Sequence, residues 1–218
     1  VYNTVVVEEN FYLSLRDLVN NRDSLADNSV PLVVTKSLTP ACSAFFEGFD
    51  NPNKRLVTND EKWSSNETLA QLNSTQHYEL IIFDSDPSFI LDVLRNLRSG
   101  NASYTLYATE YQLFNSGITN DNFMREAEVI CAMSSYLSYQ NSNTLLFVEA
   151  FRAHFGIEPN KYAVRGFDIA DYHIISTLYG ESPMRGIYLG FDHTQGKENK
   201  WVELRRFENF EWNLLRHP

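Results

Sequence analysis

Acidic side chains are the most numerous candidates for chemistry in this chain, which has 28 Asp and Glu residues against 18 Lys and Arg. A polymer hydrolase could use two carboxyl groups about 5–10 Å apart in one pocket, one of them with a raised pKa. Close acidic pairs occur at positions 8 and 9, 60 and 61, and 84 and 86. Each pair lies at the expected end of a helix or strand, where acids cap helices or face solvent. A hydrolase therefore stays an alternative without direct support.

Other common catalytic and metal-binding patterns are missing from the sequence. The nine glycines form no G-x-G-x-x-G or Walker pattern for phosphate, and the five histidines include no pair at the i, i+4 spacing of a helical zinc site. Ser85 follows an expected strand, but Asp84 and Asp86 beside it would oppose a developing oxyanion, and there is no G-x-S-x-G sequence. We therefore expect no cofactor, no metal and no enzymatic activity.

Short apolar runs alternate with segments of helical period, and this order predicts βα units around a mainly parallel sheet. The clearest unit is the apolar run 80–83, followed by Asp86 and Pro87 at a helix start and by Gly100 at the helix end. Two later runs, 186–189 and 201–204, predict a closing hairpin with Gly196 in its loop. Further strands are expected at 4–7, 31–35, 55–58, 104–107 and 129–133, and helices at 11–19, 65–72, 145–155 and 169–178.

These elements predict where a ligand would bind. We expect residues 80–83 and 104–107 to be adjacent parallel strands, with the helix 87–97 covering one face. Ligands of open parallel sheets bind outside the carboxyl ends of the strands. Those ends carry hydroxyls, aromatic rings and carboxylates that suit a small polar ligand, namely Asp84, Ser85, Thr109, Glu110, Tyr111, Ser134, Ser135 and Tyr136.

Composition bounds the class of protein. Hydrophobic residues make up 43% of the chain and charged residues 21%, which allows one buried core, and we expect a single α/β domain over residues 1–218. The net charge of -10 disfavours nucleic acid as a partner, because an acidic body repels phosphates. No run approaches the ~20 apolar residues of a membrane span. The chain opens at Val1 without a signal peptide, so we expect that an upstream piece was removed.

Two cysteines, Cys42 and Cys131, have neither the number nor the spacing of a disulfide framework or a zinc site. They lie on elements far apart in the predicted order, whereas a disulfide needs Cα atoms within about 7 Å. We expect two buried, unbridged thiols, with a single disulfide as the alternative.

Residues 147–169 carry a family resemblance. They read FVEAFRAHFGIEPNKYAVRGFDI, which resembles the F-x-x-x-[FY]-x-x-x-[FY]-G-x-x-P-x-x-[FY]-A-x-x-G-[FY]-D segment of type I periplasmic binding proteins, the branched-chain amino acid receptor group. In this interpretation an aromatic stripe packs a helix that Gly156 caps, Pro159 and Tyr162 shape a surface loop, and Asp168 opens the next helix.

The resemblance covers about residues 80–207, since 80–136 fits the strand, helix, strand order of the family and residues 190–199 resemble its closing hairpin. It implies a Rossmann-like periplasmic binding protein type I lobe and a non-catalytic solute-binding protein of the periplasm or cell envelope. The hairpin is similar to variants in Bacteroidetes envelope proteins associated with LysM modules, which implies an envelope protein or peptidoglycan as a further partner. Before residue 80 the match fades, so the expected lobe is incomplete.

The resemblance also implies site residues. Glu110 falls where amino-acid-binding members place a carboxylate that holds the ligand amine, after a strand [YF]-G-x-E whose glycine is Ala108 here. We expect Glu110 at the mouth of the strand ends, with an aromatic ring beside it and Asp168 across the gap. A scaffold that has lost its ligand and a purely structural protein-interaction module are alternatives. The expected ligand-binding residues are Ser85, Glu110, Tyr111, Tyr136 and Asp168.

Overall fold

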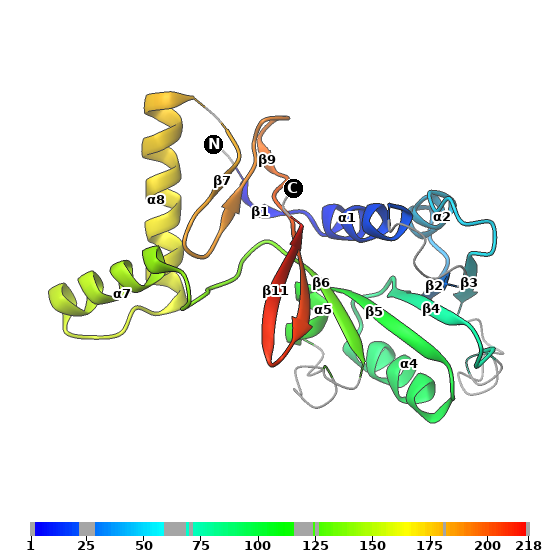
Figure 1. Ribbon diagram of the computed structural model, residues 1–218. Coiled ribbons are helices and arrows are strands. Elements are labelled where there is room, and N and C mark those ends of the chain that lie inside the picture. The colour runs from blue at the N-terminus through cyan, green and yellow to red at the C-terminus, as the bar shows by residue number, and fades with distance from the viewer. Residues whose placement is uncertain are drawn as a thin grey trace. The chain divides into compact units, whose positions relative to one another are not determined.

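The computed structural model describes residues 3–21, 29–58, 69, 72–115, 124, 127–180 and 182–216. The chain divides into two compact units, each built from segments that are distant in sequence (Figure 1). Unit 1 comprises Val1–Asn10, Met133–Glu203 and Pro218, and unit 2 comprises Phe11–Ala132 and Leu204–His217. That residues 1–218 form a single α/β domain stays a prediction.

Unit 2 is built around a seven-stranded, mainly parallel sheet. The predicted neighbours 80–83 and 104–107 are confirmed as adjacent parallel strands, with Leu80 opposite Leu106 and Ile81 opposite Tyr107. The strands at one edge form an antiparallel pair. The order across the sheet is β11 (Glu211–Arg216), β10 (Glu203–Glu208), β6 (Glu128–Met133), β5 (Ser103–Thr109), β4 (His77–Ile82), β2 (Ser29–Thr35) and β3 (Arg55–Thr58).

The central strands are buried on both faces, which explains their uninterrupted apolar runs. Leu80, Ile81 and Ile82 of β4 are all buried, as are Val129 and Ile130 of β6. A strand with one solvent face would instead alternate apolar and polar residues.

Helix α4 (Pro87–Ser99) follows β4 and lies against the sheet, as predicted (Figure 1). The Asp86 side chain accepts a hydrogen bond from the Ser88 amide, Pro87 occupies the first turn, and Gly100 ends the helix. Its buried stripe faces the core of unit 2 and consists of Phe89, Ile90, Val93, Leu94 and Leu97.

Helices α1 (Glu8–Asn20) and α2 (Pro40–Glu47) are joined to the sheet by an aromatic cluster. The ring of Tyr12 lies 5.8 Å from Phe45 and 4.4 Å from Phe83, and Phe45 lies 5.2 Å from Phe49. The sequence analysis predicts no element for the Phe-rich stretch 45–49. In the structure, the Thr39 side chain caps α2 by accepting a hydrogen bond from the Cys42 amide.

Unit 1 contains two longer helices and two small sheets. Helix α7 (Ser142–Phe155) ends at Gly156, whose φ of 69° is the left-handed conformation that glycine adopts without strain, as the motif predicted. It packs on α8 (Lys161–Tyr179) through rings of Phe147 and Phe167 that lie 4.8 Å apart. The sheets pair β1 (Asn3–Val6) with β9 (Glu198–Asn199) in parallel and β7 (Met184–Arg185) with β8 (Gly190–Phe191) in antiparallel orientation.

Two predictions from the motif are wrong. Helix α8 begins at Lys161, because the Asn160 side chain accepts hydrogen bonds from the amides of Tyr162 and Ala163. Asp168 therefore lies inside a helix and does not open one, and Tyr162 belongs to the first turn of α8 and not to a loop. The predicted helix 65–72 falls almost wholly outside the described residues.

The predicted closing hairpin of runs 186–189 and 201–204 is also wrong. The observed hairpin joins β10 to β11, and its turn residues Asn209 and Phe210 have φ values of 54° and 65°. Such positive values at both turn residues fit a type I′ turn, which matches the twist of the flanking strands. The run 201–204 instead leads into β10, and β9 pairs with β1.

Cys42 and Cys131 are buried free thiols, as expected. Burial raises the pKa of Cys42, and burial together with the nearby Glu110 carboxylate raises the pKa of Cys131 well above its usual range. Unfolded cysteine ionises at pH ~8.5. The contribution of these thiols to stability is therefore complete below that pH and is lost as the pH rises above it, because only the unfolded chain ionises.

We expect urea unfolding to show this loss. Between pH 8 and pH 10, the free energy of unfolding of the wild type should fall more than that of a Cys131→Val variant, since valine does not ionise. Other groups also titrate in this range, so the difference between the two proteins is the quantity to measure. Parallel pH dependences of the two proteins would contradict this expectation.

Candidate functional site

Three of the five predicted site residues lie at one edge of the sheet of unit 2. β4 and β5 are neighbouring parallel strands, so their carboxyl ends meet at the same edge. Ser85 is exposed in the turn after β4, and Glu110 is the first residue of α5 (Glu110–Asn115), directly after β5. Tyr111 follows with 54% of its surface exposed. We call these three residues the strand-end group.

Hydrogen bonds connect the end of β2 to the turn after β4. The Thr35 hydroxyl donates to the Phe83 carbonyl at 3.0 Å. The next residue, Lys36, forms an ion pair with Asp86 in which Nζ and Oδ2 are 2.7 Å apart. This bond lowers the pKa of Asp86 and raises the pKa of Lys36. Two further carboxyl groups, those of Asp84 and Glu110, belong to these strand ends, and Asp84 also raises the pKa of Lys36.

A buried side chain that the sequence analysis missed lies directly behind the strand-end group. Gln112 and Thr109 form a reciprocal pair. The backbone nitrogen of Gln112 donates to Thr109 Oγ1 at 3.2 Å, and the backbone nitrogen of Thr109 donates to the side-chain oxygen Oε1 of Gln112 at 2.9 Å. This is a capping box at the start of α5. The sequence Thr-Glu-Tyr-Gln at 109–112 carries the signal that could have revealed it.

Tyr136 and Asp168, the other two predicted site residues, belong to unit 1. The Tyr136 amide donates to the Tyr188 carbonyl at 2.9 Å, and its carbonyl accepts from Arg185 Nη2 at 2.6 Å. Whether these residues share a ligand with the strand-end group stays a prediction.

Asp168 is almost fully buried, and its carboxylate holds a loop of unit 1. It accepts backbone hydrogen bonds from Ile187, Tyr188 and Leu189 at 2.7–2.8 Å. A Cβ added to Gly186 would lie 2.5 Å from the Asp168 carboxyl carbon, so only glycine fits there. The loop of residues 186–189 thus surrounds the Asp168 carboxylate.

The same loop is fixed from its other side by a buried ion pair. Arg185 Nε contacts Glu203, whose side chain is only 2% exposed. Arg185 Nη1 also donates to the carbonyls of Gly186 and Leu189, at 2.9 and 3.0 Å. Neither residue was expected from the sequence, because partners so far apart along the chain leave no local pattern.

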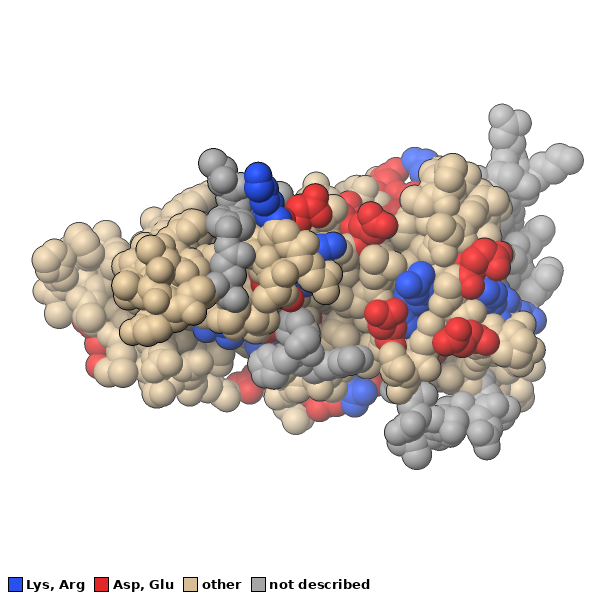
Figure 2. All heavy atoms as spheres, turned by 90° about the horizontal axis from the view of Figure 1, so that it is seen from above, with Lys and Arg blue, Asp and Glu red and all other residues tan. Residues whose placement is uncertain are grey.

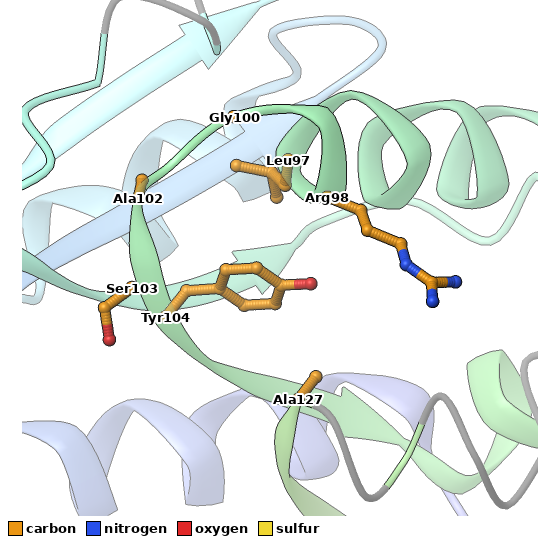
Figure 3. A pocket seen from close by; sticks show the side chains of 7 residues that line it. All are labelled: Leu97, Arg98, Gly100, Ala102, Ser103, Tyr104 and Ala127. Atoms are coloured by element: carbon orange, nitrogen blue, oxygen red, sulfur yellow. The ribbon is translucent and has the colours of Figure 1, made fainter.

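A separate pocket of about 250 Å³ lies at the amino ends of the parallel strands, where β5 begins and α4 ends (Figure 3). Its volume is below the ~300–1,000 Å³ typical of ligand pockets. The lining residues are Leu97, Arg98, Gly100, Ala102, Ser103, Tyr104 and Ala127. This pocket is distinct from the strand-end group.

Charged and apolar side chains are distributed unevenly over the surface. On the face shown in Figure 2, acidic and basic side chains are interspersed, and the end formed by α7 and α8 is mostly uncharged. Several exposed side chains of this end are apolar: Leu146, Phe155, Tyr162, Ile174, Leu178 and Tyr179. Among the described residues, no three His, Cys, Asp or Glu side chains are placed to hold a metal ion. None of the described helices has the length and hydrophobicity needed to cross a bilayer.

Solved structures share this fold. An ABC transporter substrate-binding protein from Desulfitobacterium hafniense in complex with Leu aligns with a TM-score of 0.59 and 14% identity, over 99% of this chain and 67% of that one. A further substrate-binding protein structure from that organism aligns with 0.54 and 15%, over 95% and 65%. Full-length LpoA from Haemophilus influenzae aligns with 0.53 and 12%, over 97% and 39%.

The chain thus has the α/β fold of type I periplasmic binding proteins, as the motif predicted, and it spans about two thirds or less of the length of these proteins. The likeness extends through residues 1–79, where the sequence resemblance fades, since nearly the whole chain aligns. No sequence family and no curated protein matches the chain.

Proposed function

We propose that this chain is a non-catalytic solute-binding domain of the cell envelope or periplasm, and that it binds a small amine-bearing ligand such as an amino acid. The observation that carries this proposal is the position of Glu110, which lies at the strand ends of unit 2 beside the exposed ring of Tyr111. One structural neighbour was solved with Leu bound, which supports an amino acid as the first ligand to test.

Charge favours an ammonium group at this edge. The carboxylates of Asp84 and Glu110 both lie at these strand ends, and the cation of Lys36 is paired with Asp86. A charge-assisted bond between a carboxylate and an ammonium group is worth about 1.5–3 kcal/mol. The hydroxyl of Ser85 at the end of the adjacent strand could accept a second hydrogen bond from the amine.

The two predicted site residues of unit 1 have different proposed roles. Tyr136 stays a candidate ligand contact, because its backbone is held by Tyr188 and Arg185 while its side chain is partly exposed. Asp168 is proposed as an anchor for the loop 187–189, since three amides already occupy its carboxylate.

Replacing Glu110 with Gln is expected to lower the affinity for the amino acid that binds, about tenfold, because the shape is kept while the charge is lost. Calorimetric titration of the wild type and the variant with a panel of L-amino acids, L-leucine included, measures this effect. Glu149→Gln removes an exposed acid on α7 and serves as the matched control.

Equal affinities of wild type and Glu110→Gln would contradict the assignment of Glu110. If no amino acid binds the wild type, the ligand proposal fails, and a scaffold becomes the better function. The exposed apolar side chains of α7 and α8 favour that second candidate, because apolar patches rimmed by polar residues mark protein-interaction sites.

A hydrolase has less support. A general acid of a carboxylate pair needs a raised pKa, whereas the pKa of Asp86, one member of the closest acidic pair near the strand ends, is lowered by Lys36. An association with peptidoglycan or LysM modules stays a prediction from the sequence resemblance.

A further inference from the structure

Gln112 connects the ends of two strands. Its side-chain nitrogen Nε2 donates to the carbonyl of Ile82 at 2.6 Å and to the carbonyl of Asp84 at 2.8 Å, which are the last residue of β4 and the first acid of the following turn. Nε2 also reaches the Tyr12 hydroxyl at 3.0 Å, and Oε1 accepts from the Thr109 amide at the end of β5. Gln112 is 3% exposed, and its bonds to Ile82, Tyr12 and Thr109 are buried.

The contacts determine the orientation of the side-chain amide. If oxygen and nitrogen were exchanged, the oxygen would face two carbonyl oxygens and the nitrogen would face the Thr109 amide, so these three contacts would pair like with like, and only the Tyr12 hydroxyl, which can donate or accept, would suit both orientations. The two protons of Nε2 are therefore shared among the carbonyls and the Tyr12 hydroxyl.

The side chain of Gln112 has two structural roles. Its oxygen completes the capping box with Thr109 and so fixes the start of α5, where Glu110 and Tyr111 lie. Its nitrogen holds the turn that carries Ser85, whose shape depends further on the bond from the Asp86 amide to Asp84 Oδ1 at 2.8 Å.

We propose that Gln112 is a positioning residue that fixes the Ser85 turn and the Glu110 helix start relative to each other before ligand binds. This inference rests on the proposed function for its effect on affinity, while its mechanical part can be tested without any ligand. A site held in the bound geometry beforehand loses less conformational freedom on binding, and this difference appears as affinity.

Two variants separate the two roles of the side chain. Gln112→Glu keeps an oxygen for the Thr109 amide, which is allowed at this position of a capping box, but it places a second oxygen against the Ile82 and Asp84 carbonyls. Gln112→Met keeps the length and removes both roles. Leu97→Ala is the control for general destabilisation, because Leu97 is a buried α4 residue at the amino ends of the parallel strands.

Amide hydrogen exchange, followed by NMR, tests the positioning. We expect faster exchange of the Asp86 amide in both Gln112 variants, and faster exchange of the Thr109 amide in Gln112→Met alone. Leu97→Ala should leave the ratio of these two rates as in the wild type. Wild-type exchange of the Asp86 amide in both Gln112 variants would overturn the inference, whatever calorimetry shows.

Calorimetry with L-leucine, or with whichever amino acid binds the wild type more tightly, tests the consequence for binding. Both Gln112 variants should bind roughly tenfold more weakly, while Leu97→Ala should bind as the wild type does. Unchanged affinity in a variant with accelerated Asp86 exchange would refute a role in binding and leave the proposed function intact. If the wild type binds no amino acid, the proposed function fails, and hydrogen exchange alone decides whether Gln112 holds this edge.

Discussion

Replacing Arg185 with Met is expected to lower the free energy of unfolding by about 3 kcal/mol, the lower end of the range for breaking a buried ion pair. The substitution removes the guanidinium from Glu203, whose side chain is only 2% exposed, and also removes the donors to Tyr136, Gly186 and Leu189. The lower end applies because the side chain of Arg185 is 23% exposed and water can reach part of it. Urea denaturation measures the change.

A second substitution identifies the cause of this effect. Arg185→Met combined with Glu203→Met should recover part of the loss, because the buried carboxylate is then gone as well. Arg185→Lys keeps the charge but cannot reproduce the planar fork that bonds three carbonyls, so an intermediate loss is expected. A double variant as unstable as the sum of the single ones would show that Glu203 is not the source of the cost.

Gly190→Ala is expected to destabilise the protein by about 3 kcal/mol, the upper part of the usual range for overpacking. A Cβ at Gly190 would overlap the indole ring of Trp201, and both residues are buried. The ring has little room to move, because Asn199 bonds the Trp201 amide, the Asp192 amide and the Gly190 carbonyl together. Thermal denaturation would measure the change.

Gly166→Ala is the matched control for this prediction. Gly166 lies in helix α8, and a Cβ there meets no atom within 4 Å. Alanine should therefore stabilise the helix, by about 0.5–1 kcal/mol. A Gly190→Ala protein as stable as the wild type would mean that the loop around Trp201 adjusts freely.

Local signals in the sequence predicted much of the fold. The β4–α4–β5 unit was found because three independent features agree: a continuous apolar run, the Asp86 and Pro87 start of a helix, and the stop at Gly100. Gly156 at the end of α7 was found for the same reason. In each case the deciding interaction lies within a few residues of the signal.

The remaining features depend on contacts that no short segment reveals. The hairpin was misplaced because a Gly-containing loop was expected to turn the chain, whereas Asn209 and Phe210 adopt positive φ without glycine. Asp168 looked like a helix start, but the cap at Asn160 comes eight positions earlier. The carboxylate finds its partners at 187–189, about twenty positions away. The division into two units has no local signature at all.

The passage of the chain through its two units has a consequence for the order of folding. β10 lies beside β6 in the sheet of unit 2, although the segment Met133–Glu203 of unit 1 separates them along the chain. During synthesis β6 thus emerges before its neighbour β10 exists, and that side of β6 stays without its sheet partner until β10 has been made. Long-range strand pairing of this kind is slow and leaves a nascent sheet vulnerable to joining the wrong partner. The sheet of unit 2 is therefore expected to be completed only after the segment Met133–Glu203 of unit 1 has been synthesised.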